Sequence, residues 1–468
     1  MEIDFPLIPL SLAKEDVLAL QFQDLTVTSR DNRRLLSEVS GWVKRGGITA
    51  VLGASAAGKS LLLQSLSGRV QDLQIDGRVL LDGGLVNPKH TGNPVVYVPQ
   101  EDILVGEMTP REMTLTTARL TRNESVDTLI ADTDRLLDRL MLSDVADNVI
   151  GTLLKRGISG GQKRRTSLAT ALISNPAVLF VDELTSGLDE TIAFEVLSTV
   201  RALADTGSVS VLLTIHQPNQ RMLELFDHIL ILKEGSSIFF GTVLESVQYF
   251  ENLGFISPIH VTITDYFLQI SSDMFSELDS QFDFINAYNT SSHRERCVIH
   301  LEHTFQGTTS TASMTSSPPK KVTILSQIYT LLYREYTLAY RDPTLYYLQI
   351  FLECDFCLVA GMVFYNLPRN VGTDFFVISS GISWIIDIVA WSAVFKVYHI
   401  TRNDKRASHE MANSLYSPFV YFASDTLSTA TMSIAFLPPV FVAFFMMNLP
   451  IQSLVFFLFV LWMVRTTF

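Results

Sequence analysis

The stretch VLGASAAGKSLLL, Val51–Leu63, places a phosphate-binding pattern between two apolar runs. Gly53 and the triplet Gly58–Ser60 match the pattern G-x-x-x-x-G-K-[ST]. The preceding residues Ile48–Leu52 predict a buried strand and the following residues Leu61–Ser67 predict a helix, which is the context that the pattern requires. In such a loop the backbone N–H groups and the helix N-terminus attract phosphate. The stretch therefore predicts an α/β fold with a phosphate-binding loop.

Three other apolar runs favour a largely parallel sheet. They are short and are separated by amphipathic helical stretches: Val95–Val98, Ala177–Val181 and Ser210–Thr214. This alternation is typical of βαβ units, whose parallel strands are buried on both faces. We expect one α/β domain over residues 1–268.

Paired acids follow the second of these runs. In AVLFVDELTSGLD, residues 177–189, Asp182 and Glu183 stand at the carboxyl end of the predicted strand. Beside a phosphate loop, the first acid can hold Mg²⁺ and its neighbour can act as the base toward an attacking water. The alternative is a helix N-cap cluster, because acids also stabilise helix starts. The phosphate loop makes us prefer the metal-and-base interpretation.

Three further polar positions lie at predicted element ends. Ser159–Gly161, in ISGGQKRRTSLATAL, would expose backbone N–H groups at a helix start and form a second anion site. Gln100 in YVPQED and His216 in VLLTIHQP each follow a strand, where they could reach a metal ion or its water. Taken alone, either residue would be an ordinary polar loop residue.

The composition bounds the class of protein. The chain has 468 residues, of which 47% are hydrophobic and 18% charged, and its formal net charge is −13. This length indicates two or three domains, and the low charged fraction favours a partly membrane-embedded chain. The negative charge argues against a nucleic-acid partner, since phosphate neutralisation needs clustered Lys and Arg. The three cysteines, Cys297, Cys354 and Cys357, form no disulfide framework, which favours a reducing, cytosolic setting for the soluble part.

The character of the chain changes near residue 325. Residues 269–325 include the acidic stretch SSDMFSELDSQFDF and the Ser/Thr/Pro-rich stretch QGTTSTASMTSSPPKK, so we predict a flexible linker. Residues 326–468 are membrane-like, with predicted spans over 345–365, 375–397 and 419–447, a kink in the third at Pro438-Pro439, and an incomplete fourth span over 451–464.

The charges of the loops predict the orientation of the spans. Five basic residues lie before the first span or after the second: Arg334, Arg341, Arg402, Lys405 and Arg406. The other two loops hold only Arg369. Because positive loops stay on the cytoplasmic side, we expect a multi-pass integral membrane protein whose N-terminal domain is cytoplasmic.

The order of the motifs carries a resemblance. The phosphate loop, YVPQ, SGGQ, DELTSGLD and TIHQP follow one another as in the nucleotide-binding domain of ATP-binding cassette (ABC) transporters. Here the ATPase part precedes the membrane part, which resembles the G subfamily, or White type, of half-transporters. The run QIYTLLYREYTLAYRDP, residues 327–343, is similar to the connecting helix of that subfamily. The resemblance implies an ABC cassette followed by an all-α transmembrane domain of the ABC-2 type.

The resemblance also implies roles for the matching residues. In the family, two ATP molecules lie between two head-to-tail cassettes, so the implied partner is a second half-transporter, identical or different. The residues that would bind one ATP are Gly53, Ala54, Ser55, Ala56, Ala57, Gly58, Lys59, Ser60 and Leu61. Those that would hold Mg²⁺ are Ser60, Gln100 and Asp182, and those implied in catalysis are Glu183, Gln100 and His216. The residues that would contact the partner's ATP are Ser159, Gly160, Gly161 and Gln162, with Asp189 bridging the two sites.

Four positions depart from the family pattern. Glycine is usual at Ala56 and threonine is frequent at Leu61. If residue 56 has a left-handed backbone, alanine costs about 1 kcal/mol, whereas in a right-handed backbone the exchange is nearly free. An aromatic that stacks on adenine is usual at Val27, so we expect lower ATP affinity. Leu184 replaces the usual proline at a position that we expect to tolerate the change.

The predicted spans contain three acids, Glu353, Asp355 and Asp387. Burying a charge in hydrocarbon costs at least about 2.5 kcal/mol. One hypothesis is therefore that an acid lines the translocation path and favours cationic or polar substrates. The alternative is that the acid lies near the membrane interface or is protonated. We expect Cys354 and Cys357 to be ordinary packing cysteines.

The leading prediction is a half-transporter subunit that couples ATP hydrolysis to the export of a lipid-like or xenobiotic small molecule through a lipid membrane. A soluble-type ABC ATPase of translation or repair is opposed by the apolar spans. A regulatory, non-hydrolysing partner subunit is favoured by Val27 and Ala56 but opposed by Glu183 and His216. Because a family membrane domain has more spans than the three complete ones here, we expect the chain to be truncated.

Overall fold

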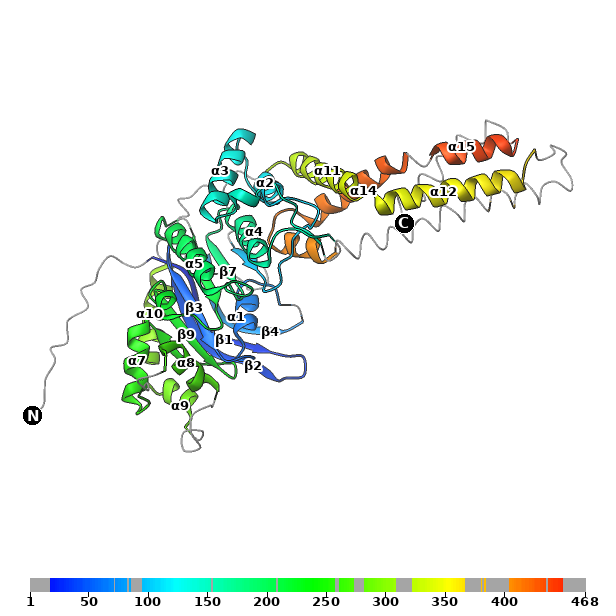
Figure 1. Cartoon of the computed structure of the whole chain (residues 1–468). Helices are drawn as coiled ribbons and strands as arrows, with labels where there is room; N and C mark the ends of the chain where they lie inside the picture. Colours follow the sequence, from blue (N-terminus) through cyan, green and yellow to red (C-terminus); the bar gives the residue numbers. More distant parts are fainter. Residues whose placement is uncertain are drawn as a thin grey trace, which may run out of the picture. The chain divides into compact units, whose positions relative to one another are not determined.

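The computed structural model describes residues 17–70, 72–81, 84–85, 95–152, 155–207, 209–256, 261–272, 282–308, 322–366, 380, 383, 404–434 and 437–448. The chain divides into two compact units (Figure 1). We call residues 1–102, 131–146 and 158–318 the sheet unit. We call residues 103–130, 147–157 and 319–468 the helical unit.

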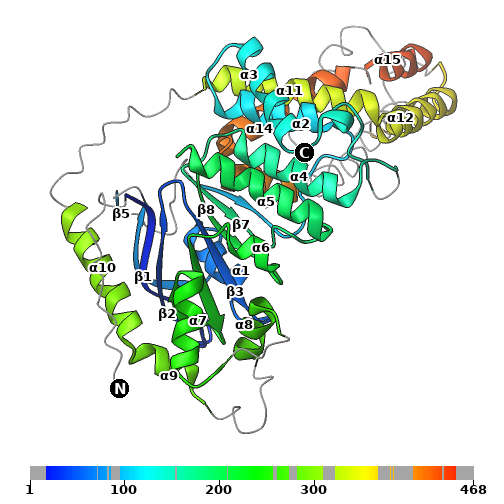
Figure 2. The same ribbon diagram turned by 60° about the vertical axis from the view of Figure 1, so that its left-hand side comes forward.

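The sheet unit is built on a ten-stranded sheet of order β5-β4-β1-β2-β10-β9-β3-β8-β7-β6 among the described residues. Its strands are β1 (Leu18–Thr28), β2 (Arg34–Lys44), β3 (Ile48–Gly53), β4 (Gln74–Leu81), β5 (Gly84–Leu85), β6 (Val95–Val98), β7 (Val178–Val181), β8 (Ser210–Thr214), β9 (His228–Lys233) and β10 (Ser236–Gly241). Figure 2 shows the strands side by side with helices along them.

One half of the sheet is parallel and confirms the predicted strands. β3 pairs in parallel with β8 and β9, and β7 pairs in parallel with β6 and β8. Every residue of these strands is buried, because helices such as α1 (Lys59–Leu66) and α8 (Ile263–Ser272) pack against them. The carboxyl ends of β3, β6, β7 and β8 therefore meet at one edge, which is where open parallel sheets bind ligands.

The other half of the sheet is antiparallel, with β1 between β2 and β4. Helix α10 (Ser292–Thr308) runs along this half (Figure 2) and packs against β1, β2 and β10. Cys297 and Leu301, one helical turn apart, are buried on its inner face, and Thr304 Oγ1 donates to Gln21 Oε1 at 3.0 Å.

The prediction of a flexible linker over 269–325 is thus wrong for the residues from 284 to 308. They form α9 (Phe284–Asn289) and α10, because a sparse apolar stripe that includes Phe284, Tyr288 and Leu301 is covered by the sheet unit. The segment is polar on average, so a prediction from its overall composition did not detect the few apolar residues of this stripe. Residues 309–321 lie outside the described residues.

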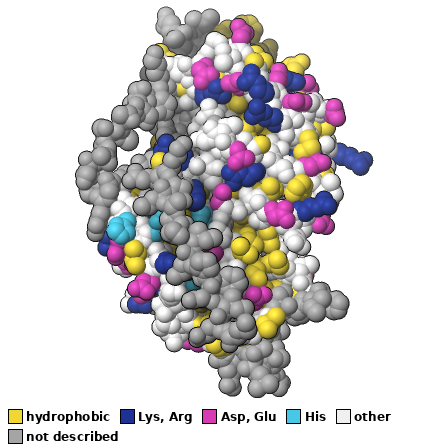
Figure 3. All heavy atoms as spheres, turned by 90° about the vertical axis from the view of Figure 1, so that its left-hand side faces the viewer, with side chains coloured by type: hydrophobic (Ala, Val, Ile, Leu, Met, Phe, Trp, Pro, Cys, Tyr) yellow, Lys and Arg dark blue, Asp and Glu magenta, His cyan; other side chains and the backbone are white. Residues whose placement is uncertain are grey.

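Several more helices lie wholly or partly in the sheet unit. They are α3 (Val126–Arg139), which has residues in both units, η2 (Ser143–Val145), α4 (Gly160–Leu172), α5 (Glu190–Asp205), α6 (Gln220–Leu223) and α7 (Val243–Asn252). On the face shown in Figure 3, basic and acidic side chains are interspersed over the described surface. Exposed pairs of this kind contribute only about 0–1 kcal/mol each, so the buried core carries the stability.

The helical unit contains α2 (Pro110–Thr121), α11 (Ile324–Arg341), α12 (Thr344–Val363), α14 (Pro418–Ser433) and α15 (Leu437–Met446). Helix α11 packs against α2 and α14, and α12 packs against α15. Leu120, Leu331, Leu415 and Val420 form a buried cluster there. Helix α11 occupies the place predicted for a connecting helix over 327–343 and begins three residues earlier, where Thr323 caps it by accepting from Ser326 N.

Among the described residues, no helix combines the length and the apolar character that crossing a membrane requires. The first predicted span, 345–365, falls on α12, which has 20 residues. The third, 419–447, is divided into α14 and α15. Residues 435–436, between these two helices, lie outside the described residues, and Pro438-Pro439 belong to α15. The span 451–464 lies outside the described residues, as does 375–397 apart from 380 and 383.

Candidate ATP site

The phosphate loop connects β3 to α1, and two of its glycines are required by the backbone and by space. Gly53 has φ 149°, and a Cβ there would lie 2.4 Å from the carbonyl oxygen of Leu232. Gly58, the N-cap of α1, has φ 97°, and a Cβ there would lie 2.7 Å from Leu36 Cδ2. Only glycine reaches these conformations without strain. The loop thus brings its backbone close to β9 and β2.

Ala56 decides the alternative that the sequence left open. Its φ is 64°, in the left-handed region. For alanine this backbone costs about 1 kcal/mol relative to the right-handed one. Ala56 is exposed at the loop tip, whereas its neighbour Ala57 is 4% exposed and is not among the described residues with positive φ. The strain is therefore confined to one of the two alanines.

Lys59 is held inside the loop. It is 7% exposed, and its Nζ donates to the carbonyl oxygens of Gly53 at 2.7 Å and Ala54 at 2.8 Å. Burial lowers the pKa of the ammonium group, and the nearby carboxylates of Glu183 and Asp182 oppose that shift. The cation is thus placed beside the loop that is predicted to hold phosphates, with two acids close to it.

Asp182 is the centre of a buried hydrogen-bond cluster. The residue is 3% exposed. Its Oδ1 accepts from Ser60 Oγ at 3.0 Å and from Thr214 Oγ1 at 2.7 Å, and its Oδ2 accepts from Tyr97 OH at 3.2 Å. Burial and the Asp182 charge raise the pKa of Tyr97 to about 12, which keeps the phenol a donor. Ser60 and Asp182 thus present adjacent oxygen atoms, the donor type that Mg²⁺ prefers.

Glu183 adopts a strained backbone and is tied on several sides. Its φ is 52°, an uncommon value for a residue other than glycine. Its N–H donates to Thr214 Oγ1 at 2.7 Å, and its Oε2 accepts from Gln100 Nε2 at 2.7 Å. The following residue, Leu184, is fully buried, so an apolar side chain satisfies this position.

His216 borders the phosphate loop. It is exposed just beyond β8, and its Nε2 lies 3.4 Å from Ser55 Oγ. The structure thus brings the predicted residues His216, Gln100 and Glu183 to the same edge of the sheet as the phosphate loop.

The second predicted anion site lies at the start of α4. Ser159 caps the helix by accepting from Gln162 N at 3.3 Å, and Gln162 Oε1 accepts from Ser159 N at 2.8 Å. Ser159 and Gly160 are exposed, and a Cβ at Gly160 would meet nothing within 4 Å. The packing of this chain therefore does not require glycine at 160. Asp189, at the N-cap of α5, is exposed as well and makes no side-chain capping bond.

Val27 has no exposed surface. It lies in β1 opposite Leu36 of β2 and Ile75 of β4. A fully buried aliphatic side chain cannot stack on an adenine ring, so the position offers a base no aromatic platform.

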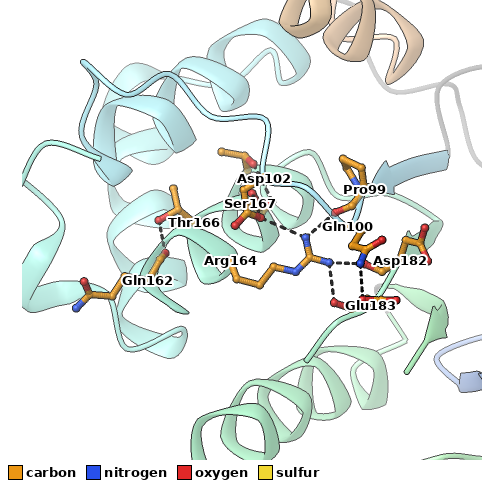
Figure 4. A network of polar contacts seen from close by, with 10 residues as sticks. Pro99, Gln100, Asp102, Gln162, Arg164, Thr166, Ser167, Asp182 and Glu183 are labelled. Atoms are coloured by element: carbon orange, nitrogen blue, oxygen red, sulfur yellow. Dashed lines mark hydrogen bonds and ion pairs between the residues drawn. The ribbon is translucent and has the colours of Figure 1, made fainter. Parts of the chain in front are cut away.

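Three polar residues of the site were missed at the sequence level: Tyr97, Thr214 and Arg164. All three lie inside the quoted motifs, but Tyr97 and Thr214 occur in strands, where sequence patterns indicate packing only. Arg164 is 1% exposed and donates to atoms of Pro99, Asp102, Asp182 and Glu183 (Figure 4). The signal that could have found it is its spacing. It precedes buried Leu168 by four residues on α4 and so lies on the inner face.

Two family descriptions match most of the chain. The family described as ABC transporter matches residues 36–186, which contain the phosphate loop and the paired acids. The family described as ABC-2 type transporter matches residues 326–468, and a second ABC-2 type transporter family matches 216–286. The chain belongs to the ABC transporter family. It joins an N-terminal ABC ATPase domain to an ABC-2 membrane segment, the arrangement of a half-transporter.

Curated relatives of this ABC chain are G family members. It is 29% identical over 448 residues to ABC transporter G family member 11 of Arabidopsis thaliana, covering 87% of this chain and 62% of that protein. It is 39% identical over 251 residues to member 19 of the same plant, covering 53% and 34%. It is 41% identical over 223 residues to member 24 of Dictyostelium discoideum, covering 47% and 19%. The chain thus spans less than two thirds of each of these relatives.

A solved ATP-binding cassette of an ABC transporter in its ADP conformation is 23% identical to the chain, with a TM-score of 0.41. The match covers 48% of this chain and 91% of the solved one.

Proposed function

We propose that the chain is a half-transporter subunit that couples ATP hydrolysis to the movement of a lipid-like or xenobiotic substrate across a membrane. The observation that carries the proposal is that Lys59, Asp182 and Glu183 lie together at one edge of the sheet. The same chain also contains an ABC-2 segment. The three residues supply a phosphate ligand, a metal ligand and a base within one site.

Each group of the site has a proposed task. The loop from Gly53 to Leu61 binds the phosphates of ATP through backbone N–H groups and Lys59. Ser60, Gln100 and Asp182 would hold Mg²⁺, whose bound charge neutralises charge developing on the phosphoryl oxygens. The donor set fits this ion, because Ser60 and Asp182 already present oxygen atoms within 3.0 Å of each other.

Glu183 is the proposed base toward the attacking water. The hydrogen bond from Gln100 orients its carboxylate, and the buried Thr214 hydroxyl holds its backbone N–H. His216 is proposed to contact the γ-phosphate, which its place beside Ser55 of the loop supports. In this scheme the residues orient a water and accept its proton, as general base catalysis requires.

A second cassette is the proposed partner. The start of α4, with exposed Ser159 and Gly160 and half-buried Gly161 and Gln162, would contact the ATP of the other cassette, and Asp189 would bridge the sites. Support comes from Gly160, where glycine is not needed for internal packing and a close external approach would explain it.

A regulatory, weakly hydrolysing subunit of a heterodimer is the second candidate. It is favoured by the left-handed backbone of Ala56 and by the burial of Val27, both of which would weaken ATP binding. The complete set of Lys59, Asp182 and Glu183 opposes it, because a purely regulatory cassette has no need of a held base.

The translocation path is proposed to lie in the ABC-2 segment, with a membrane acid favouring cationic or polar substrates. Asp355 is exposed on α12. The side chain of Glu353 and all of Asp387 lie outside the described residues. The proposed cytoplasmic orientation of the ATPase domain rests on the loop charges and on the absence of a disulfide framework among the three cysteines.

ATP turnover of the purified full chain in lipid nanodiscs tests the proposal. We expect Glu183→Gln to lower kcat by about 10²-fold or more while ATP binding persists, since a positioned base contributes at least that factor. Lys59→Ala should weaken ATP binding itself. ATP-dependent uptake of fluorescent lipid and xenobiotic probes by inside-out vesicles then measures whether ATP hydrolysis is coupled to transport. If Glu183→Gln hydrolyses ATP as fast as the native chain, the assignment fails and the regulatory candidate takes its place.

A further inference from the structure

We propose that Arg164 of α4 is a positioning residue that keeps Gln100 and Glu183 in their reactive arrangement. The inference rests on the proposed function, since Gln100 and Glu183 are the catalytic groups of that proposal. Arg164 itself touches neither the phosphate loop nor any expected ligand atom among the described contacts, so it acts through the groups that it holds.

The guanidinium group joins two chain segments that end neighbouring strands (Figure 4). Nη1 donates to the carbonyl oxygen of Pro99 at 2.6 Å and to Asp102 Oδ1 at 3.2 Å, one on each side of Gln100. Nη2 donates to the carbonyl oxygens of Asp182 at 2.5 Å and Glu183 at 3.1 Å. One buried cation therefore sets the separation between the backbone that carries Gln100 and the backbone that carries Glu183.

This separation matters because the Gln100–Glu183 contact is a single hydrogen bond of 2.7 Å. Glu183 also has φ 52°, a conformation that persists only where the surroundings determine it. Thr214 holds the N–H of Glu183 and Arg164 holds its carbonyl, so the peptide groups on both sides of the strained residue are tied. Without Arg164, the strain favours a rotation that would turn the carboxylate away.

Arginine suits this position and lysine does not. The planar guanidinium offers several N–H donors in a fixed fork, whereas an ammonium group is a compact point charge on a flexible stem. The side chain is 1% exposed, so its charge must be compensated. Asp102 supplies the compensation and is itself held by Ser167 Oγ of the same helix at 2.8 Å. Helix α4 thus contributes both Arg164 and the group that orients its counter-ion.

Helix α4 also begins with the segment that is proposed to contact the partner's ATP. Arg164 lies slightly more than one turn after Ser159, so a shift of α4 would be transmitted to Gln100 and Glu183 through one side chain. The proposed role is therefore to link the start of α4 to the base in the same cassette.

The test must separate positioning from support of the fold. Arg201 of α5 is the control, because it is a partly buried arginine that, like the fully buried Arg164, ties two segments of the sheet unit. Its Nη1 donates to Asp227 Oδ2 at 2.6 Å and its Nη2 to the carbonyl oxygen of Gly46 at 2.9 Å. These segments precede β9 and β3, at the end of those strands opposite the phosphate loop.

The full chain is compared as native protein, Arg164→Lys, Arg164→Met, Arg201→Lys, Arg201→Met and Glu183→Gln. The readouts are kcat, the KM for ATP and the thermal midpoint, with rates expressed per folded protein. We expect Arg164→Met to lower kcat by about 10- to 100-fold, as a displaced catalytic group does, and Arg164→Lys to recover part of it. The KM for ATP should change by less than about twofold, since phosphate binding is untouched. The Arg201 variants should lower the midpoint while retaining kcat.

Equal kcat values per folded protein for the Arg164 and Arg201 variants would overturn the inference. If Arg164→Met does not fold, Asp102→Asn provides the test, because it removes the counter-ion and leaves the arginine. That variant should lower kcat below that of the native chain with an unchanged KM, and a native kcat would count against the inference. Failure of Glu183→Gln to lower kcat would instead overturn the proposed function, which keeps the two failures distinct.

Discussion

Single backbone angles set the quality of the ATP site. Ala56 and Glu183 both have left-handed backbone, at φ 64° and φ 52°, yet their surroundings differ. Glu183 is held by hydrogen bonds on its N–H, its carbonyl and its carboxylate, so its conformation is determined by its neighbours. Ala56 lies exposed at the loop tip, where few neighbouring side chains compensate for its strained backbone. Replacing the alanine by glycine would remove this strain directly.

Replacing Ala56 by glycine should tighten ATP binding. Glycine reaches φ 64° freely, so a gain of about 1 kcal/mol in the loop conformation corresponds to a Kd lowered by up to about fivefold. Equilibrium titration of the Mg²⁺-containing full chain with ATP measures it, in a Glu183→Gln background that prevents turnover. Ala57→Gly is the control, because this buried alanine is not strained and its change should not improve binding. The same Kd for the native chain and Ala56→Gly would show the alanine to be harmless.

At the scale of elements, α11 is anchored in the helical unit by a buried ion pair. Arg334 and Glu410 are 2% and 6% exposed in their side chains, and Arg334 Nη1 donates to both carboxylate oxygens at 2.8 and 3.0 Å. Tyr416 OH donates to Glu410 Oε2 at 2.6 Å. Burial opposes the charge of Glu410, but the cations of Arg334 and Arg406 outweigh it and lower the pKa of that carboxyl.

Removing one partner of this pair should destabilise the chain strongly. Arg334→Met leaves the buried Glu410 without its hydrogen-bonded cation, and removing one partner of a buried pair typically costs about 3–5 kcal/mol. The double variant Arg334→Met/Glu410→Leu should recover most of that loss, because both charges of the pair are then removed and the remaining buried cation, Arg406, keeps Glu335 as its partner at 3.0 Å. Chemical unfolding of the full chain in one detergent measures all variants together. A double variant no more stable than Arg334→Met would contradict the pairing argument, and an unchanged single variant would show the pair to be weak.

Over the whole molecule, the two matched family regions are joined within the helical unit. Helix α2 belongs to the ABC transporter match and α11 to the ABC-2 match. Arg341 at the end of α11 donates from both Nη atoms to the Glu112 carboxylate of α2, each at 2.6 Å. Glu112 also closes the capping box of α2, so this pair fixes the start of α2 to the end of α11. A bidentate pair of this kind adds geometric specificity as well as energy, so it fixes the orientation of the two helix ends.

The proposed head-to-tail dimer gives a prediction for mixed subunits. Lys59→Ala and Ser159→Arg should each abolish ATP turnover in a homodimer, because every site then lacks one component. In a mixed dimer, one site carries both changes and the other carries neither, so part of the turnover should return. Two affinity tags isolate the mixed dimers before the ATPase assay. Pure mixed dimers without turnover would contradict the shared sites, and Lys59→Ala paired with itself is the inactive control.

Local sequence was sufficient for much of the site. The phosphate loop, the acids after β7, Gln100 and His216 could be placed because motif spacing and strand periodicity depend on neighbouring residues only. The strand ends then converged because parallel strands share one carboxyl edge. The strands at 48–52, 95–98, 177–181 and 210–214 and the order of ATPase part and membrane part were predicted in this way.

The tertiary structure alone decided the rest. Whether Ala56 is strained depends on how the loop closes against β2 and β9, and whether Val27 can meet a base depends on the strands beside β1. The role of Arg164 appears only when α4 packs against the ends of β6 and β7, and the helices α9 and α10 form only because the sheet covers their apolar stripe. The physical reason is the same each time: backbone strain and buried charge are settled by contacts between residues far apart in the sequence, which local periodicity does not contain.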